Sequence, residues 1–244
     1  MVTVVLAAGY ATRLYPLTEN FPKPLLQVQG KTILDWLLDD IRGFSSEYVV
    51  VSNHRFSTHF QQWAEHKEMK ITILDDGTST NEGRLGAVCD LQLALESVRS
   101  DENLLVMAGD NLLDFSLKSF LRYAESKGTS CVMRFYQPDS QKLSKSGVVT
   151  VDENDRILRM TEKSPEPETN WVVPPFYYYL RQDANRVREA VADGCGTDAP
   201  GSFLSWLCSR SPVYAMEMPG RRYDIGTLES YQAVCSRYRG ICGK

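Results

Sequence analysis

Short apolar runs and helix-periodic segments alternate along the first half of the chain. Five runs, mostly apolar or β-branched, are typical of buried strands: 2–6, 48–52, 71–74, 103–108 and 130–136. The segments between them carry apolar residues every three or four positions and predict helices at 33–44, 56–67, 86–98 and 117–126. This alternation predicts an α/β fold in which a mixed, mostly parallel central sheet has helices on both faces.

The pattern changes after Pro138, but no linker or repeat separates the later part of the chain. Two strands, 147–151 and 157–162, flank a polar turn, and an aromatic-rich strand is expected at 172–180. The remaining expected elements are helices at 184–192 and 202–209, a strand at 213–218, a turn at 223–227 and a helix at 228–238. We therefore predict one domain over residues 1–244.

Composition is that of a globular protein and disfavours some partners. The chain has 244 residues, of which 43% are hydrophobic, so it can bury a sizeable core. Its formal net charge of -4 argues against nucleic acid or an acidic membrane as a partner. No apolar run approaches the roughly 20 residues that span a bilayer, and Met1 leads into a strand without a signal-peptide pattern. We therefore expect a cytoplasmic protein.

The residues after the first strand have the build of a phosphate-binding turn. Ala7, Ala8 and Gly9 let the backbone come close to an anion, and N–H groups can point toward it. Arg13 follows, and a guanidinium there can bind two oxygens of a polyphosphate. Lys23 lies between two prolines that stiffen the chain. Each cation alone is typical of a surface, but beside this turn the two together predict a phosphorylated ligand.

Acidic residues that follow strands offer candidate metal ligands. Asp110 stands at the end of an apolar strand, and Asp224 precedes a predicted helix. Carboxylate oxygens suit Mg2+, which also keeps waters and substrate phosphates, although either aspartate could instead cap a helix or form a turn. Because ligands bind at the carboxyl ends of strands, we expect Asp110 and the turn after the first strand to meet in one cleft. Glu162 and Lys163 form either an exposed ion pair or a hydroxyl acceptor beside a phosphate-binding cation.

Taken in order, the motifs of this chain resemble those of the sugar-1-phosphate nucleotidylyltransferases, which include the glucose-1-phosphate thymidylyl- and uridylyltransferases. The resemblance covers nearly the whole chain, and the ordered set of motifs is far more specific than any one of them. The motifs are LAAGYATRLYPLT at 6–18, PKPL at 22–25, GRLGA at 83–87, AGDN at 108–111, GVV at 147–149, TEKSP at 161–165 and YDIGT at 223–227.

The resemblance implies a Rossmann-like nucleotidyltransferase fold, a Mg2+ requirement and the reaction NTP + sugar 1-phosphate → NDP-sugar + pyrophosphate. It implies a nucleotide-binding half at about 1–136 and a sugar-phosphate-binding half at about 137–244. The implied catalytic residues are Arg13, Lys23 and Asp110, and the implied metal ligands are Asp110 and Asp224. The implied nucleotide-binding residues are Leu6, Ala8, Gly9, Thr12, Arg13, Gly86 and Asp110. The implied substrate-binding residues are Lys23, Asn111, Gly147, Glu162, Lys163 and Tyr177.

Two departures from the family pattern leave parts of the assignment open. Ala11 stands where the family usually has a second glycine, so either Ala11 adopts a conformation compatible with its Cβ or the loop shifts. Residues 75–82 contain no glutamine, which thymidylyl and uridylyl members typically carry before the base-contacting glycine, so the base is open. The sugar and the oligomeric state are open too, with a homo-oligomer as one alternative.

Two other functions remain alternatives. The same fold could transfer a nucleotidyl group from CTP to phosphocholine or a phosphonate, and a sugar-shaped pocket around Glu162 and Lys163 would count against this. A non-catalytic, pyrophosphorylase-like regulatory subunit could lose its phosphate-binding cations or its metal aspartates, whereas this chain has all four. No hexapeptide repeat follows the predicted domain, so we expect no appended acyltransferase β-helix.

Overall fold

The computed structural model describes residues 1–241, whose contacts divide the chain into two compact units. Unit 1 comprises residues 1–84, 108–118 and the segment from Pro219 onward, and unit 2 comprises residues 85–107 and 119–218. The chain leaves unit 1 twice and returns to it twice, so each unit gathers segments that lie far apart in the sequence. The single catalytic domain expected from the sequence stays a prediction.

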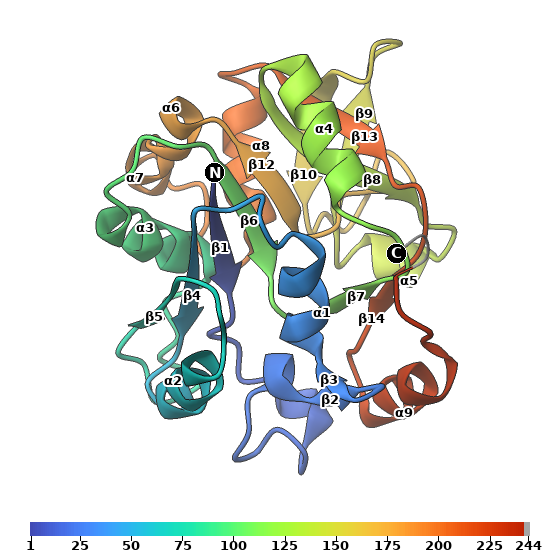
Figure 1. The fold of residues 1–244 in the computed structure, drawn as a ribbon. Coiled ribbons are helices and arrows are strands. Elements are labelled where there is room, and N and C mark those ends of the chain that lie inside the picture. The colour runs from blue at the N-terminus through green and yellow to red at the C-terminus, as the bar shows by residue number, and fades with distance from the viewer. Residues whose placement is uncertain (242–244) are drawn as a thin grey trace. The chain divides into compact units, whose positions relative to one another are not determined.

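Unit 1 is built on three parallel strands in the order β1–β4–β5, which lie side by side in Figure 1. The strands are β1 (Val2–Leu6), β4 (Glu47–Ser52) and β5 (Ile71–Asp75). Their sequences are rich in valine and isoleucine, which suit a pleated surface, and all of β1 is buried. Parallel neighbours need crossover connections, and these contain α1 (Ile33–Asp40) and α2 (Ser57–Glu65).

Two short antiparallel pairs and one helix complete unit 1. The pairs are β2 (Gln27–Val28) with β3 (Lys31–Thr32) and β7 (Asn111–Leu113) with β14 (Arg222–Asp224). Helix α9 (Leu228–Arg237) contributes to a core that includes Leu26, Ile33, Leu112, Ile225, Val234 and Tyr238. The Tyr238 hydroxyl also donates to the Leu113 carbonyl oxygen at 2.8 Å. These contacts hold the residues that follow β14 close to β7.

Unit 2 holds a mixed set of strands in the order β10–β9–β11–β8–β12–β6, and β13 pairs in parallel with β8. Ala108 and Lys118, which end β6 and begin α4, count with unit 1. The strands are β6 (Leu104–Ala108), β8 (Ser130–Tyr136), β9 (Gly147–Val151), β10 (Ile157–Glu162), β11 (Trp171–Val172), β12 (Phe176–Tyr179) and β13 (Val213–Glu217). The helices are α3 (Ala87–Ser97), α4 (Lys118–Lys127), α5 (Ser140–Leu143), α6 (Arg181–Ala184), α7 (Val187–Ala192) and α8 (Gly201–Cys208).

Most expected elements are present with shifted ends, but three expectations were wrong. The expected strand at 172–180 is two strands, β11 and β12, because Pro174 and Pro175 between them lack the N–H groups of a continuous ladder. The expected helix at 184–192 is interrupted between α6 and α7. The expected turn at 223–227 begins as β14, whose partner β7 lies about a hundred residues earlier and is invisible to local patterning. Within residues 1–241, no helix combines the length and the apolar character that crossing a membrane requires.

Candidate active site

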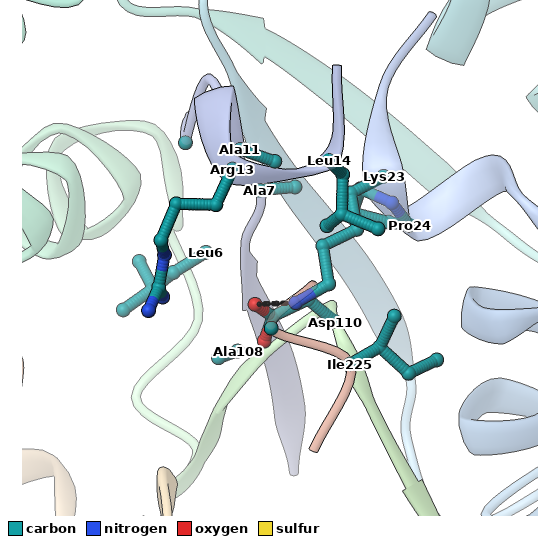
Figure 2. Close-up of a pocket in the computed structure, with 12 residues that line it drawn as sticks. Leu6, Ala7, Ala11, Arg13, Leu14, Lys23, Pro24, Ala108, Asp110 and Ile225 are labelled. Carbon is teal, nitrogen blue, oxygen red and sulfur yellow. Dashed lines mark hydrogen bonds and ion pairs between the residues drawn. The ribbon is translucent and has the colours of Figure 1, made fainter. Parts of the chain in front are cut away.

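A cavity of about 170 Å³ in unit 1 brings together three residues that the sequence singles out. Arg13, Lys23 and Asp110 all line it, together with residues of the turn after β1 (Figure 2). Leu6, the last residue of β1, lines the cavity too, so the site lies at the carboxyl end of that strand. Ile225 completes the lining from the segment after β14, so four separate stretches of the chain contribute to it.

Gly109 allows the backbone to approach β1 and places Asp110 beside the cavity. The Gly109 N–H donates to the Leu6 carbonyl oxygen at 3.1 Å. A Cβ on Gly109 would lie 2.9 Å from a Val5 methyl carbon, which is closer than Cβ contacts normally are, and in van der Waals contact with Pro24 at 3.4 Å. Glycine is therefore required here by space, and the residue that follows it is held at the end of the strand.

The turn after β1 is fixed on one side and open on the other. The Ala7 N–H donates to the Val51 carbonyl oxygen at 2.9 Å, and the Asn53 side-chain amide donates to the Ala8 carbonyl oxygen at 2.9 Å. No atom lies within 4 Å of the position that a Cβ on Gly9 would take. The N–H groups of Ala8 and Gly9 have no acceptor within residues 1–241. Gly9 lines the cavity, so its N–H is available to an anion there, whereas Ala8 is buried and is not among the lining residues.

Ala11 adopts the left-handed conformation, with φ 48° and ψ 40°. Its carbonyl oxygen accepts from the Thr18 hydroxyl at 2.8 Å and from the Leu14 N–H at 2.9 Å. The sequence left open whether Ala11 adopts a conformation compatible with its Cβ or the loop shifts. Ala11 occupies the left-handed region, which an L-residue can adopt but glycine adopts more easily. A short 3-10 turn, Thr12–Leu14, follows directly and carries Arg13 to the cavity.

Replacing Ala11 with glycine is expected to raise the free energy of unfolding by about 0.5 kcal/mol. The left-handed conformation costs an L-residue about 1–2 kcal/mol, and the greater freedom of glycine in the unfolded chain offsets about 0.4–1 kcal/mol of the gain. Thermal unfolding should show a melting temperature higher by roughly 1–2 °C. A lower melting temperature would mean that the Ala11 methyl group stabilises the loop by packing more than its backbone conformation costs.

The two cations of the cavity differ in their surroundings. Arg13 is exposed and has no acidic partner within residues 1–241, and its Nη2 atom lies 4.0 Å from the position of a Cβ on Gly226. Only 7% of the Lys23 side chain is exposed, and its Nζ atom forms an ion pair with Asp110 Oδ2 at 2.8 Å. Figure 2 shows the Arg13 guanidinium standing apart from this pair. Arg13 is therefore available to an added anion, whereas Lys23 is already paired with the Asp110 carboxylate.

The Asp110 carboxylate is charged and partly open to the cavity. Burial alone would raise its pKa, but the charge and hydrogen bond of Lys23 outweigh burial, and the pKa lies below its usual value. The Oδ1 atom accepts from the Asn111 side-chain amide at 2.7 Å. Since 40% of the Asp110 side chain is exposed, its oxygens keep lone pairs for a further cation.

Asp224 lies on β14, and Asp110 directly precedes β7, the strand that pairs with β14. Asp224 is opposite Asn111 in the antiparallel register of β14 and β7, and 64% of its side chain is exposed. The Arg222 side chain lies between Asn111 and Asp224. Its Nη1 atom donates to Asn111 Oδ1 at 2.6 Å and is 4.0 Å from Asp224 Oδ1. Two accessible carboxylates fit a hard cation such as Mg2+, which takes one or two of them and fills its shell with phosphates and waters. Residues 1–241 hold no cluster of three or more potential metal-ligating side chains, so substrate oxygens would have to complete the site.

A second cavity, of about 330 Å³, lies in unit 2 and is lined by Glu162 and Lys163. These residues follow one another at the end of β10. The Lys163 Nζ atom forms an ion pair with Asp198 Oδ2 at 2.8 Å. Burial raises the pKa of the Glu162 carboxyl to about 7, and the Lys163 charge offsets only part of this effect. This cavity therefore presents a carboxyl group that changes its charge near neutral pH.

The remaining residues of the implied sets shape these cavities or lie outside them. Gly147 is opposite Glu162 in the β9–β10 register, and a Cβ on it would lie 2.5 Å from Glu162 Oε2. Tyr177 is buried in β12 and lines neither cavity. Asn111 is buried in β7, and Thr12 is exposed at the start of its 3-10 turn. Their roles toward a ligand stay predictions.

Gly86 packs against a loop that lines the second cavity. It has φ +92° at the start of α3, and a Cβ on it would lie 2.5 Å from the Thr197 carbonyl oxygen. The Val88 N–H donates to that same oxygen at 3.0 Å, and the Ala87 N–H donates to the Asp198 carbonyl oxygen at 3.4 Å. The sequence did not single out Thr197 and Asp198. Their sequence indicates a loop, but it does not indicate that this loop contacts α3, which lies about a hundred residues earlier.

Replacing Glu162 with glutamine is expected to stabilise the protein more at pH 8 than at pH 5. The Glu162 carboxyl has a pKa of about 7 in the folded protein, against an ordinary value of 4.5. Between these two values it binds more protons in the folded state than in the unfolded state, so its contribution to stability is lost as pH rises from 4.5 to 7. Glutamine is uncharged throughout and removes this dependence. The melting temperature of the variant minus that of the wild type should therefore become more positive from pH 5 to pH 8. A difference that does not change with pH would contradict the raised pKa.

The chain is similar to known proteins over nearly its whole length. A family sequence model described as Nucleotidyl transferase matches residues 2–239. The UTP–glucose-1-phosphate uridylyltransferase AglF of Haloferax volcanii is 29% identical over 240 residues, which cover 94% of this chain and 93% of that protein. A UTP–glucose-1-phosphate uridylyltransferase of a Synechocystis species is 24% identical over 255 residues, which cover 100% of this chain and 64% of that protein.

Some curated relatives are much longer than this chain. The chain spans 64%, 51% and 61% of the length of three of them. Among solved structures, a UDP-glucose pyrophosphorylase complexed with UDP-glucose matches with a TM-score of 0.80 at 19% identity and covers 97% of both chains. At this identity the likeness shows the fold alone, and it confirms the expected Rossmann-like fold with its mixed sheet.

Proposed function

Because this chain belongs to the nucleotidyl transferase family, as its motifs predicted, we propose that it transfers a nucleotidyl group from an NTP to a sugar 1-phosphate. The products are an NDP-sugar and pyrophosphate. The main support is the cavity of unit 1, which is lined by Arg13, the Lys23–Asp110 ion pair and Gly9. Within residues 1–241, Arg13 has no acidic partner and the Gly9 N–H has no acceptor. Such a set of groups suits a polyphosphate together with a cation.

The charged residues in and beside the cavity have distinct roles in the proposed reaction. Arg13 binds the β- and γ-phosphates, which leave as pyrophosphate, through its planar pair of N–H donors. Lys23 binds an oxygen of the α-phosphate or of the attacking phosphate. Asp110, which lines the cavity, and Asp224, which is not among its lining residues, would hold Mg2+, and this ion would supply positive charge that neutralises the phosphates. The N–H groups of the turn after β1 orient the triphosphate.

The bond changes need no strong base. An oxygen of the sugar phosphate, already an anion near neutral pH, attacks the α-phosphorus of the NTP and forms a new P–O bond. The bond from this phosphorus to the oxygen that bridges to the β-phosphate breaks, and pyrophosphate leaves with the electron pair. The main obstacle is the repulsion between two polyanions that must meet in line, so the charges of Arg13 and Lys23 contribute by screening it.

The cavity of unit 2 favours a sugar over phosphocholine as the acceptor. Apart from Glu162 and Lys163, the lining drawn from residues 1–241 consists of short side chains and includes no aromatic ring. Quaternary ammonium groups are bound over aromatic rings, whereas sugar hydroxyl groups need acceptors such as a carboxylate. Glu162 supplies such an acceptor, and Lys163 supplies a positive charge for the phosphate.

A matrix of substrates tests the proposal. Each of the four NTPs is combined with several sugar 1-phosphates and with phosphocholine in the presence of Mg2+, and pyrophosphate release is measured. We expect release with at least one sugar 1-phosphate and none with phosphocholine. Release with only CTP and phosphocholine would select the cytidylyltransferase alternative, and no release in any combination would favour a regulatory subunit.

A further inference from the structure

The Glu162 carboxylate lies in a slot between β9 and the start of α8. A Cβ on Gly147, in β9, would lie 2.5 Å from Glu162 Oε2, and a Cβ on Gly201, the first residue of α8, would overlap the same oxygen. Both positions are buried, and the two glycines face the carboxylate from different elements. Neither glycine has a positive φ, so their backbone conformations do not require glycine. What they provide is space.

In the part of the chain that the structure describes, no hydrogen bond fixes this carboxylate in the slot. Within residues 1–241, no donor reaches the Glu162 side chain, although burial and the neighbouring charges of Lys163 and Asp198 act on it. Its position is therefore set by the shape of its surroundings, and its oxygens keep their lone pairs for a ligand in the cavity. A change in the shape of the slot should move the carboxylate directly.

The walls of the slot cannot easily move apart. Helix α8 packs on β10, and the Ser205 hydroxyl donates to the Met160 carbonyl oxygen at 2.8 Å, which ties the second turn of the helix to the strand that carries Glu162. Met160 is on the same face of β10 as Glu162, and its Cε atom would lie 2.9 Å from a Cβ on Gly201. The methionine end is flexible and can give way, so the carboxylate is the group that a new Cβ would displace.

We infer that Gly201 is a positioning residue for acceptor binding, because it leaves the space in which the Glu162 carboxylate is held toward the cavity. The inference rests on the proposed function of that cavity as the acceptor site. Gly201 itself touches no acceptor and acts through Glu162. The resemblance assigns it no role, and nothing in the local sequence distinguishes it from an ordinary glycine at the start of a helix.

A double-mutant cycle tests this inference. Gly201→Ala is expected to raise the KM for the sugar 1-phosphate by about 10- to 100-fold, because misplacement of a binding group by about 1 Å has effects of this size, with the KM for the NTP within about twofold. In a Glu162→Ala background, the same change should leave the acceptor KM within about twofold. Equal effects of Gly201→Ala in both backgrounds, or no effect in either, would overturn the inference. Ser209→Ala, at the opposite end of α8, is the matched control and should leave both KM values unchanged.

Thermal unfolding gives a second readout that needs no activity. The pH-dependent difference in melting temperature between glutamic acid and glutamine at position 162 should disappear in the Gly201→Ala background, because the displaced carboxyl is no longer buried. A difference that persists there would overturn the inference even if the substrate matrix shows no activity, so the two failures are distinguishable. If the Gly201→Ala variant does not fold, the double variant that also carries Glu162→Ala should fold. Failure to fold in both would show that the space serves another group.

Discussion

Replacing Asp110 with asparagine should lower the rate of pyrophosphate release by at least about 1000-fold, which corresponds to about 4 kcal/mol in the activation free energy. Asparagine keeps the size of the side chain and an oxygen that accepts from Lys23, but it removes the negative charge that a divalent cation needs. The fold should persist, with a free energy of unfolding lower by roughly 1–3 kcal/mol, because one partner of a charged hydrogen bond becomes neutral. A coupled pyrophosphate assay and thermal unfolding measure the two effects.

Asp39→Asn is the matched control for this experiment. Asp39 belongs to the same unit and forms an ion pair with Lys31 at 2.7 Å, but it lines no part of the cavity. Its replacement should leave the rate within about twofold, since exposed ion pairs contribute little. Wild-type activity should also disappear with a chelator and return with Mg2+. A rate near that of the wild type for Asp110→Asn would show that this carboxylate does not hold the metal.

Replacing Arg13 with alanine should lower kcat by about 100- to 1000-fold, while the KM for the sugar 1-phosphate changes by no more than about threefold. The guanidinium lines the cavity and has no acidic partner among residues 1–241, so its charge is free to stabilise the pyrophosphate that would leave. The acceptor does not bind to this group in the proposed reaction. Steady-state kinetics with the two substrates varied separately would measure both constants.

Arg13→Lys separates charge from geometry. Lysine keeps the positive charge but loses the planar pair of donors, so an intermediate kcat is expected. Both variants should melt within about 2 °C of the wild type, because Arg13 is exposed and forms no ion pair within residues 1–241. A large rise in the acceptor KM with an unchanged kcat would place Arg13 at the sugar phosphate instead.

The part of the site built on β1 could be predicted from sequence because ligands bind at the carboxyl ends of strands in such sheets. A buried apolar strand followed by small residues and cations predicts an anion site at its carboxyl end, and Arg13 and Lys23 do line one cavity there. Asp110 joins them because the glycine before it lets the backbone approach β1. Ala11 shows the limit of this reasoning: the departure from glycine is visible in the sequence, but the left-handed φ of 48° is not.

Contacts across long sequence separations could not be predicted from local patterns. Gly86 resembles a family position that lies against the base, yet its close neighbour in the structure is the Thr197 carbonyl oxygen. The pairing of β14 with β7 places Asp224 opposite Asn111, although the sequence around it is typical of a turn. In both cases the partner is about a hundred residues away, and only the folded chain brings the two together.

The ion pair of Lys23 with Asp110 bears on the order in which ligands enter. In the protein alone, an ammonium group 2.8 Å away already balances this carboxylate, so a bare dication is attracted to it less strongly than to an unpaired carboxylate. In the proposed reaction, a triphosphate would offer the lysine other oxygens and free the carboxylate. In the proposed reaction, a metal ion bound to the nucleotide would therefore bind more favourably than a metal ion alone, and the site would hold little metal before the nucleotide enters.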